Sequence, residues 1–293
     1  MRLVIVSGLS GSGKSVALNV LEDIGFYCID NVPAALLGAL IEQTIKERDA
    51  LYDNIAVGVD ARNRAVDLET LPDQLRTVKE QGVLSEIVFL HATDEILLKR
   101  YRETRRKHPL RTDDMSLLDA IQQERELLSP IIYLADLVVE TTESSIYELR
   151  THLTERLAIR EAGALSIQIE SFGFKYGVPY DADFVFDVRC LPNPYWVQEL
   201  RPLNGKDEAV REFLGCKAIT TTMQNDILDF LRKRIPEYLE NERHYLTVAI
   251  GCTGGQHRSV YLAEKITAEL RREQDNVLIR HNRLPELQDE DQA

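Results

Sequence analysis

The sequence predicts an α/β fold with two domains: a parallel sheet with helices on both faces, followed by a second, C-terminal α/β domain. Three observations support this prediction. The chain has 293 residues, which is more than one compact core usually contains. Short apolar runs alternate with longer segments of helical period. In each half, a glycine-rich loop connects an apolar run to a helical segment.

Five apolar runs predict the strands of the first sheet. They are apolar throughout, as is typical of strands that helices cover on both faces, and the segments between them are long enough for crossover helices. The runs are Leu3–Val6, Phe26–Ile29, Ile55–Val59, Ile87–Leu90 and Leu137–Val139. A helical stretch then extends from Ser144 to about Arg160, so we expect the first domain at residues 1–160.

Four further runs and two helical segments make the second half α/β as well. The strands are expected at Leu165–Ile169, Phe184–Val188, Tyr245–Ile250 and Val277–Ile279, and the helices at Thr221–Leu239 and Arg258–Arg272. A proline-rich irregular piece covers residues 191–194. We expect the second domain at residues 161–285 and a solvated acidic tail at residues 286–293.

The composition is that of a folded protein without a membrane span. Hydrophobic residues make up 44% of the chain and charged residues 28%, and no stretch approaches the roughly 18 apolar residues of a spanning helix. We therefore expect a cytoplasmic protein with no membrane partner. The cysteines lie far apart, which argues against a zinc site and a disulfide framework. They are Cys28, Cys190, Cys216 and Cys252.

The formal net charge of −13 is distributed unevenly. Residues 1–155 carry 17 basic and 26 acidic side chains, a net charge of −9, and the last eight residues contribute −4. Residues 156–285 are balanced, with 18 side chains of each sign. An acidic surface does not attract nucleic acid, so any RNA would have to bind the second domain.

The first glycine-rich loop fits the pattern G-x-x-x-x-G-K-[ST], with a predicted strand before it and a predicted helix after it. Its backbone N–H groups and the helix N-terminus would bind phosphate oxygens. Lys14 would reach the β- and γ-phosphates, and Ser15 would ligate Mg²⁺. This motif makes the first sheet one of the P-loop NTPase type. Its residues are Gly8, Leu9, Ser10, Gly11, Ser12, Gly13, Lys14 and Ser15.

A P-loop site also needs an acid at the end of a neighbouring strand, to position the metal or its water. Asp60 follows one predicted strand and precedes Ala61, Arg62 and Asn63, and Asp30 follows another. Either acid could instead cap a helix.

A basic run from Lys99 to Arg111 contains seven cationic side chains and one acid, Glu103. Two interpretations are open. The run could be a lid that closes over transferring phosphates, as in small nucleotide kinases. It could also be a solvated helix face.

The second glycine-rich loop lies between a strand-like run and a helical segment, and its composition suits a phosphate monoester. It also matches Cys-x₅-Arg-Ser, the phosphate loop of cysteine-dependent phosphatases, in which Cys252 would be the nucleophile. A purely structural turn is the third interpretation. The candidate ligand-binding residues are Cys252, Thr253, Gly254, Gly255, His257, Arg258 and Ser259.

Five blocks of sequence together resemble the RapZ / YvcJ family of bacterial P-loop nucleotide-binding proteins. They occur in order over nearly the whole chain. The blocks are GLSGSGKSVALNVLEDIGFYCIDNVP, VDARN, TRRKHPL, SFGFKYGVPYDADFVFDVRCLPNP and VAIGCTGGQHRSVY.

The resemblance implies binding and weak hydrolysis of ATP and GTP, with ATP at the P-loop and GTP-type contacts at residues 60–63. It implies a site for a sugar phosphate, glucosamine-6-phosphate, at the second loop. It further implies an adapter that binds small regulatory RNA and presents it to an endoribonuclease to control amino-sugar synthesis, and a homo-oligomer. The RNA contacts would be Arg271, Arg272, Arg280 and Arg283.

Two other functions remain open from the residues alone. In a small-molecule kinase, Asp30 or Asp60 would activate an acceptor hydroxyl and the basic run would be a catalytic lid. In a phosphatase, Cys252 would attack the phosphate.

Overall fold

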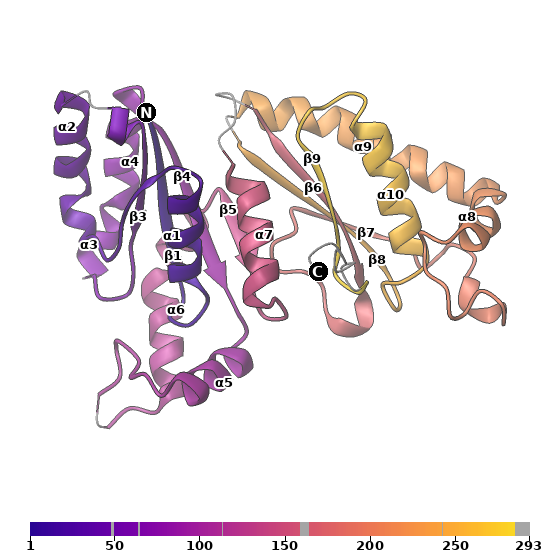
Figure 1. Cartoon of the computed structure of the whole chain (residues 1–293), viewed down its shortest axis with the longest axis horizontal. Coiled ribbons are helices and arrows are strands. Elements are labelled where there is room, and N and C mark those ends of the chain that lie inside the picture. Colours follow the sequence, from indigo (N-terminus) through magenta and orange to yellow (C-terminus); the bar gives the residue numbers. More distant parts are fainter. Residues whose placement is uncertain (48–49, 64, 113, 159–163, 242, 285–293) are drawn as a thin grey trace, which may run out of the picture. The chain divides into compact units, whose positions relative to one another are not determined.

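A computed structural model describes residues 1–284 apart from 48–49, 64, 113, 159–163 and 242. The chain divides into two compact units, Met1–Ala162 and Gly163–Ala293 (Figure 1). The expected boundary at residue 160 and the expected acidic tail lie outside the described residues. No helix among the described residues is long and apolar enough to cross a membrane.

The first unit contains a five-stranded parallel sheet with the strand order β2-β3-β1-β4-β5. The central strands are buried along almost their whole length, which explains why their sequences are continuously apolar. The strands are β1 (Arg2–Gly8), β2 (Tyr27–Ile29), β3 (Asn54–Gly58), β4 (Leu84–His91) and β5 (Leu137–Glu140).

Helices cover both faces of this sheet (Figure 1). Helices α1 and α7 pack together on one face, and α4 and α6 contact β4 on the other. The helices are α1 (Lys14–Asp23), α2 (Leu37–Glu47), α3 (Ala65–Glu69), α4 (Leu71–Glu80), α5 (Asp94–Thr104), α6 (Leu117–Leu134) and α7 (Ile146–Leu157), with short 3₁₀ turns at Ala34–Leu36 and Ala50–Tyr52. Helix α7 ends earlier than predicted, because Ala158 adopts an extended ψ of 144°.

The second unit contains a four-stranded sheet, also entirely parallel, with the order β7-β8-β6-β9. The two central strands are fully buried, and α10 packs against three of the strands and against α9. The elements are β6 (Ser166–Gly173), β7 (Phe184–Asp187), α8 (Glu208–Gly215), α9 (Ala218–Glu240), β8 (Tyr245–Cys252), α10 (Arg258–Leu270) and β9 (Val277–His281), with 3₁₀ turns at Phe174–Tyr176 and Pro194–Trp196.

The predicted fold class is confirmed: a parallel sheet between helices, and a second α/β unit. The parallel order has a consequence for function. The carboxyl ends of all strands meet at one edge of each sheet, where ligands bind in open α/β folds. Both glycine-rich loops follow a central strand, β1 in the first sheet and β8 in the second, and therefore lie at that edge.

Candidate nucleotide and anion sites

The first glycine-rich loop forms one turn between β1 and α1. The Lys14 ammonium folds back over it and donates to the carbonyl oxygen of Gly8 at 2.8 Å. Only glycine fits at Gly8, because a Cβ there would lie 2.4 Å from the carbonyl oxygen of Leu90. Ser15 is exposed at the start of the helix. The predicted phosphate-binding residues, Gly8 to Ser15, are therefore together in a turn that has the form of a phosphate cradle.

Three carboxylates act on the Lys14 ammonium. Burial lowers the pKa of Lys14 below its ordinary value, and Glu124, Asp60 and Asp30 oppose this shift, Glu124 most strongly. Both acids that the sequence singled out, Asp60 and Asp30, thus lie within electrostatic reach of the loop lysine.

Asp60 is buried, and a tight turn begins at this residue after β3. Its carboxylate accepts a hydrogen bond from the Arg62 backbone at 2.9 Å and lies 3.5 Å from the Arg62 side chain. The Asn63 side-chain amide donates to the Asp60 carbonyl oxygen at 2.9 Å and accepts the Ala34 N–H at 2.6 Å. Ala61 is buried. Asn63 therefore fixes the turn, and Asp60 supplies its negative charge.

Sequence reasoning singled out neither Glu124 nor His108. Helix α6 places the Glu124 carboxylate against the P-loop, where it accepts hydrogen bonds from the Ser10 N–H at 2.9 Å and the Ser10 hydroxyl at 2.6 Å. His108 Nε2 lies 3.0 Å from the same carboxylate, and neither side chain is exposed. A signal was present: Glu124 stands on the apolar face of its helix. The other buried residues of that face are Ala120, Ile121, Leu128 and Ile131.

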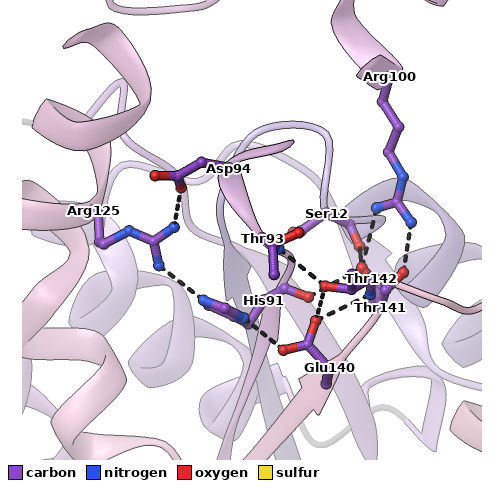
Figure 2. A network of polar contacts seen from close by, with 9 residues as sticks. All are labelled: Ser12, His91, Thr93, Asp94, Arg100, Arg125, Glu140, Thr141 and Thr142. Carbon is purple, nitrogen blue, oxygen red and sulfur yellow. Dashed lines mark hydrogen bonds and ion pairs between the residues drawn. The ribbon is translucent and has the colours of Figure 1, made fainter. Parts of the chain in front are cut away.

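The predicted basic run does not form one continuous helix face. Helix α5 ends at Thr104, because Arg105 adopts a left-handed φ of 52°. Within the helix, Arg100 donates to the carbonyl oxygen of Thr141 at 2.6 Å (Figure 2). It also donates to the carbonyl oxygen of Gly11 at 3.0 Å, and so braces the P-loop. The cations that follow, Arg105 to Lys107, are exposed. A lid role for these exposed cations stays a prediction.

A second polar network lies beside the P-loop (Figure 2). His91 Nδ1 lies 2.9 Å from the Glu140 carboxylate, and its Nε2 lies 2.8 Å from Arg125, which also binds Asp94. Burial alone would raise the pKa of Glu140, but hydrogen bonds from His91 and Thr142 outweigh it, so this pKa is lowered. The network joins the ends of β4 and β5 to α5 and α6.

The second glycine-rich loop lies between β8 and α10 and packs tightly on the end of β6. A Cβ on Gly173 would lie 2.7 Å from the backbone of Gly254, so glycine is required at this contact. Arg258 is 5% exposed: it donates to the carbonyl oxygens of Arg189 at 2.8 Å and Leu191 at 3.1 Å, and its other terminal nitrogen lies 3.3 Å from the Thr253 hydroxyl. Its Nε has no hydrogen-bond partner among the described residues.

Cys252 lies inside this loop rather than at its surface. Its Sγ accepts the Gly255 N–H at 3.2 Å and lies 3.2 Å from the Ser259 hydroxyl. Burial alone would raise the pKa of Cys252, but the hydrogen bonds from Ser259 and Gly255 and the charge of Arg258 lower it below its ordinary value. His257 Nε2 lies 3.2 Å from the carbonyl oxygen of Leu200. The predicted loop residues are thus brought together around a buried cation and a polarised thiol.

A phosphatase that used Cys252 as nucleophile would need a general acid, and Asp187 is the candidate at the end of the neighbouring strand. Asp187 ends β7 opposite Gly251 in the strand register. It is bound by Arg189 at 2.6 Å, and this hydrogen bond lowers the pKa of Asp187. An aspartate held as a carboxylate is a poor proton donor, which counts against a phosphatase.

The four arginines expected to contact RNA have different environments. Arg271 donates to the carbonyl oxygen of Val277 at 3.0 Å, and Arg272 pairs with Glu269 at 2.7 Å. Arg280 is in β9, and the Arg283 guanidinium lies 3.5 Å from the centre of the Tyr176 ring. Sequence reasoning did not expect this cation–π contact.

These features define a class of protein: a P-loop nucleotide-binding protein with a second α/β domain. The chain belongs to the RapZ family, because residues 1–161 match the RapZ-like N-terminal domain and residues 165–285 match the RapZ C-terminal domain.

Curated relatives agree with this assignment. A nucleotide-binding protein of Methylococcus capsulatus is 50% identical over 290 residues, which is 99% of this chain and 98% of the relative. A nucleotide-binding protein of Halorhodospira halophila is 49% identical over 97% of this chain and 99% of its own. A nucleotide-binding protein of Pseudomonas paraeruginosa is 51% identical over 97% of this chain and 99% of the relative.

Among solved structures, the chain is similar to a shikimate kinase from Bacteroides thetaiotaomicron, with a TM-score of 0.36 and 16% identity over 54% of this chain and 99% of that one.

Proposed function

We propose that the first domain binds ATP or GTP with Mg²⁺ and hydrolyses it slowly. The observation that carries the proposal is the P-loop turn itself, with Lys14 folded over it and three carboxylates acting on that lysine. The loop amides would bind the phosphates, and Lys14 would neutralise the terminal ones. Ser15 would ligate Mg²⁺ together with phosphate oxygens, and Asp60 would hold the metal or its water.

Slow hydrolysis follows from the acids near the loop. A general base needs a carboxylate that can take a proton near neutral pH. Glu124 accepts hydrogen bonds from Ser10 and His108, and its pKa is lowered, so it is a weak base. The Asp60 carboxylate already accepts a hydrogen bond from the Arg62 backbone and lies 3.5 Å from the Arg62 side chain.

Nucleotide binding by Lys14→Ala tests this proposal. We expect the variant to lose at least tenfold in affinity for ATP and GTP, because the cation at the terminal phosphates is gone. Lys79→Ala is the matched control, since Lys79 is an exposed lysine on α4 of the same domain. Equal affinity in wild type and Lys14→Ala would contradict the proposal.

For the second domain, we propose a site for a phosphorylated sugar, with glucosamine-6-phosphate as the ligand. The buried guanidinium of Arg258, with its unpartnered Nε, and the Thr253 hydroxyl would bind the phosphate. Titration with glucosamine-6-phosphate, glucosamine and inorganic phosphate tests this. Loss of binding in Arg258→Lys is expected, because lysine cannot reproduce a bidentate contact. Equal binding of glucosamine without phosphate would count against the site.

We further propose that this cytoplasmic protein is an adapter that binds small regulatory RNA and presents it to an endoribonuclease. Exposed aromatic rings with cations stacked on them support an RNA surface on the second domain. Tyr176 is 51% exposed beneath Arg283, and Tyr195 is 48% exposed beneath Arg201.

Filter binding of small RNAs across a salt series tests the RNA surface. Removing residues 271–293 would also remove strand β9, so point variants are the better choice. We expect Tyr176→Ala to weaken binding by about tenfold at every salt concentration, because stacking is lost, and Arg283→Ala also to reduce the salt slope. Unchanged binding in both variants would exclude this surface.

A small-molecule kinase is the second candidate, because Asp30 and Asp60 both act on Lys14 and either could face an acceptor hydroxyl. Transfer of label from ATP to a metabolite pool would favour it. Release of inorganic phosphate alone would favour the regulatory protein.

A further inference from the structure

A carboxylate of the protein itself occupies one amide of the P-loop. The Ser10 N–H and hydroxyl bind the two oxygens of Glu124, at 2.9 and 2.6 Å. Ser10 is the third of the eight loop residues, away from the amides at the start of α1. The helix-side amides remain for the inner phosphates of a nucleotide. Glu124 thus already accepts the Ser10 N–H, which is not available to a phosphate oxygen while this bond is made.

His108 fixes this carboxylate in its charged form. Its Nδ1 accepts the N–H of Leu110 at 3.2 Å, so the ring proton is on Nε2, which donates to Glu124 at 3.0 Å. Burial alone would raise the pKa of Glu124, but hydrogen bonds from His108 and Ser10 and the charge of Lys14 outweigh it, so this pKa is lowered. A fixed anion therefore stands beside the loop at neutral pH.

We propose that Glu124 is the residue by which the site discriminates a triphosphate from a diphosphate, and that His108 positions it. The proposal rests on nucleotide binding at the P-loop. The P-loop lysine reaches the β- and γ-phosphates, and Glu124 is the acid that acts most strongly on Lys14. A terminal phosphate therefore arrives beside a like charge that already uses the Ser10 amide, which weakens binding of ATP relative to ADP.

Calorimetric titration with ADP and with a non-hydrolysable ATP analogue, both with Mg²⁺, tests the proposal. In Glu124→Gln, which keeps the shape and removes the charge, the ratio of the ATP-analogue Kd to the ADP Kd is expected to fall about tenfold. Glu124→Asp keeps the charge and should stay near the wild-type ratio. His108→Phe removes the donor and should lower the ratio, whereas His108→Gln, which keeps an N–H donor, should restore it.

Glu140→Gln is the matched control. Glu140 is also paired with a histidine in this domain, at 2.9 Å, and its carboxylate accepts the Thr142 N–H at 3.0 Å. We expect its ratio to equal that of wild type. Ser10→Ala removes one of the two bonds to Glu124 and should lower the ratio by a smaller factor, so the proposal stays testable if Glu124→Gln does not fold.

Three results would overturn the inference. If Glu124→Gln binds ADP normally and its ratio of the two Kd values is unchanged, the inference is overturned, but the proposed nucleotide binding is not. Weaker binding of the ATP analogue in that variant would show that Glu124 supports the terminal phosphate or its metal. A wild-type protein that binds neither nucleotide would overturn both the inference and the proposed function.

Discussion

Cys252 shows how one buried side chain organises a loop. Gly255 has a φ of +74°, and this turns its N–H into the loop, where the Cys252 sulfur accepts it. This hydrogen bond is buried, and a buried N–H needs an acceptor, which the sulfur provides. On this basis the thiol stabilises the loop whatever ligand the loop binds.

We therefore predict that Cys252→Val lowers the free energy of unfolding by about 1–3 kcal/mol, because it leaves the Gly255 N–H without an acceptor. Cys252→Ser keeps an acceptor and should cost less. Urea unfolding of both variants measures the difference, with Cys216→Ser, a change at an exposed cysteine, as the control. Equal losses in the valine and serine variants would refute the hydrogen-bond role.

At the residue scale, the sequence predicts local sites better than distant contacts. The residues from Gly8 to Ser15 follow a spacing that one strand, one turn and one helix impose, so their grouping is readable. Glu124 lies 114 positions from Ser10, and no local spacing brings them together. His108 lies between α5 and α6, and its burial depends on the position of α6 in space, which a linear pattern does not give.

Helix α7 is an element whose start is fixed by its own sequence. The Ser145 hydroxyl accepts the Glu148 N–H at 3.2 Å, and the Glu148 carboxylate accepts the Ser145 N–H at 2.6 Å, a reciprocal capping box. The helix packs on α1, and Leu149 would lie 2.8 Å from a Cβ on Gly13. Helix α7 is far from the P-loop in sequence, but it packs beside the P-loop glycine Gly13 and so stabilises the loop.

Ser145→Ala should lower the free energy of unfolding by about 1 kcal/mol, because one helix-end N–H loses its acceptor. Ser129→Ala, at a half-buried serine whose hydroxyl donates to Glu126 within α6, is the control and should change it by less. Thermal unfolding compares the two variants. If both lose the same amount, the capping box contributes nothing beyond a serine inside a helix.

Strand β9 is held by a histidine between two partners. His281 Nδ1 lies 2.8 Å from the Ser171 hydroxyl on β6, and its Nε2 lies 3.1 Å from Glu264 on α10, which also faces Lys206 at 3.4 Å. Burial lowers the pKa of His281 below its ordinary value, and Glu264 only partly opposes this. The folded protein thus prefers the neutral ring.

A pH dependence follows from this lowered pKa. Below the unfolded value of about 6.5 the unfolded chain binds a proton that the folded chain resists, so stability is lost as the pH falls from 6.5 toward the folded pKa. His281→Gln removes this contribution. Urea unfolding at about pH 7.5 and pH 5.5 should therefore show a smaller loss in the variant than in wild type. Identical losses would mean that His281 does not titrate in this window.

At the scale of elements, the apolar runs predict each strand among the described residues, central and edge alike, and the differences lie at the strand ends. Strands β1, β6 and β8 are buried on both faces, so a continuous apolar run marks them. The edge strand β7 is alternately half-buried and exposed, and its predicted end at Val188 is one residue beyond the observed Asp187. Strand β7 pairs with a neighbouring strand on one side only, so its end is free to turn away from the sheet. The position of this end depends on tertiary structure and not on the local sequence.

For the whole molecule, the two units have separate hydrophobic clusters. One cluster consists of residues from Leu3 to Ile131, and the other of residues from Leu165 to Val277. Among the described residues the two clusters have no member in common, and the residues named for each candidate site belong to a single unit. The uneven charge follows the same division, because most of the acidic excess belongs to the nucleotide-binding half.

This separation predicts that each ligand stabilises its own unit. In a calorimetric melt, ADP at about 100 times its Kd should raise the free energy of unfolding of the first unit by about 2.7 kcal/mol and shift one transition only. Glucosamine-6-phosphate should shift the other transition, because Arg258 and Thr253 belong to the second unit. Lys14→Ala should lose the first response and keep the second, and Arg258→Lys the reverse. If either ligand shifted both transitions equally, the units would unfold as one, and coupling between the two sites would have to replace independence.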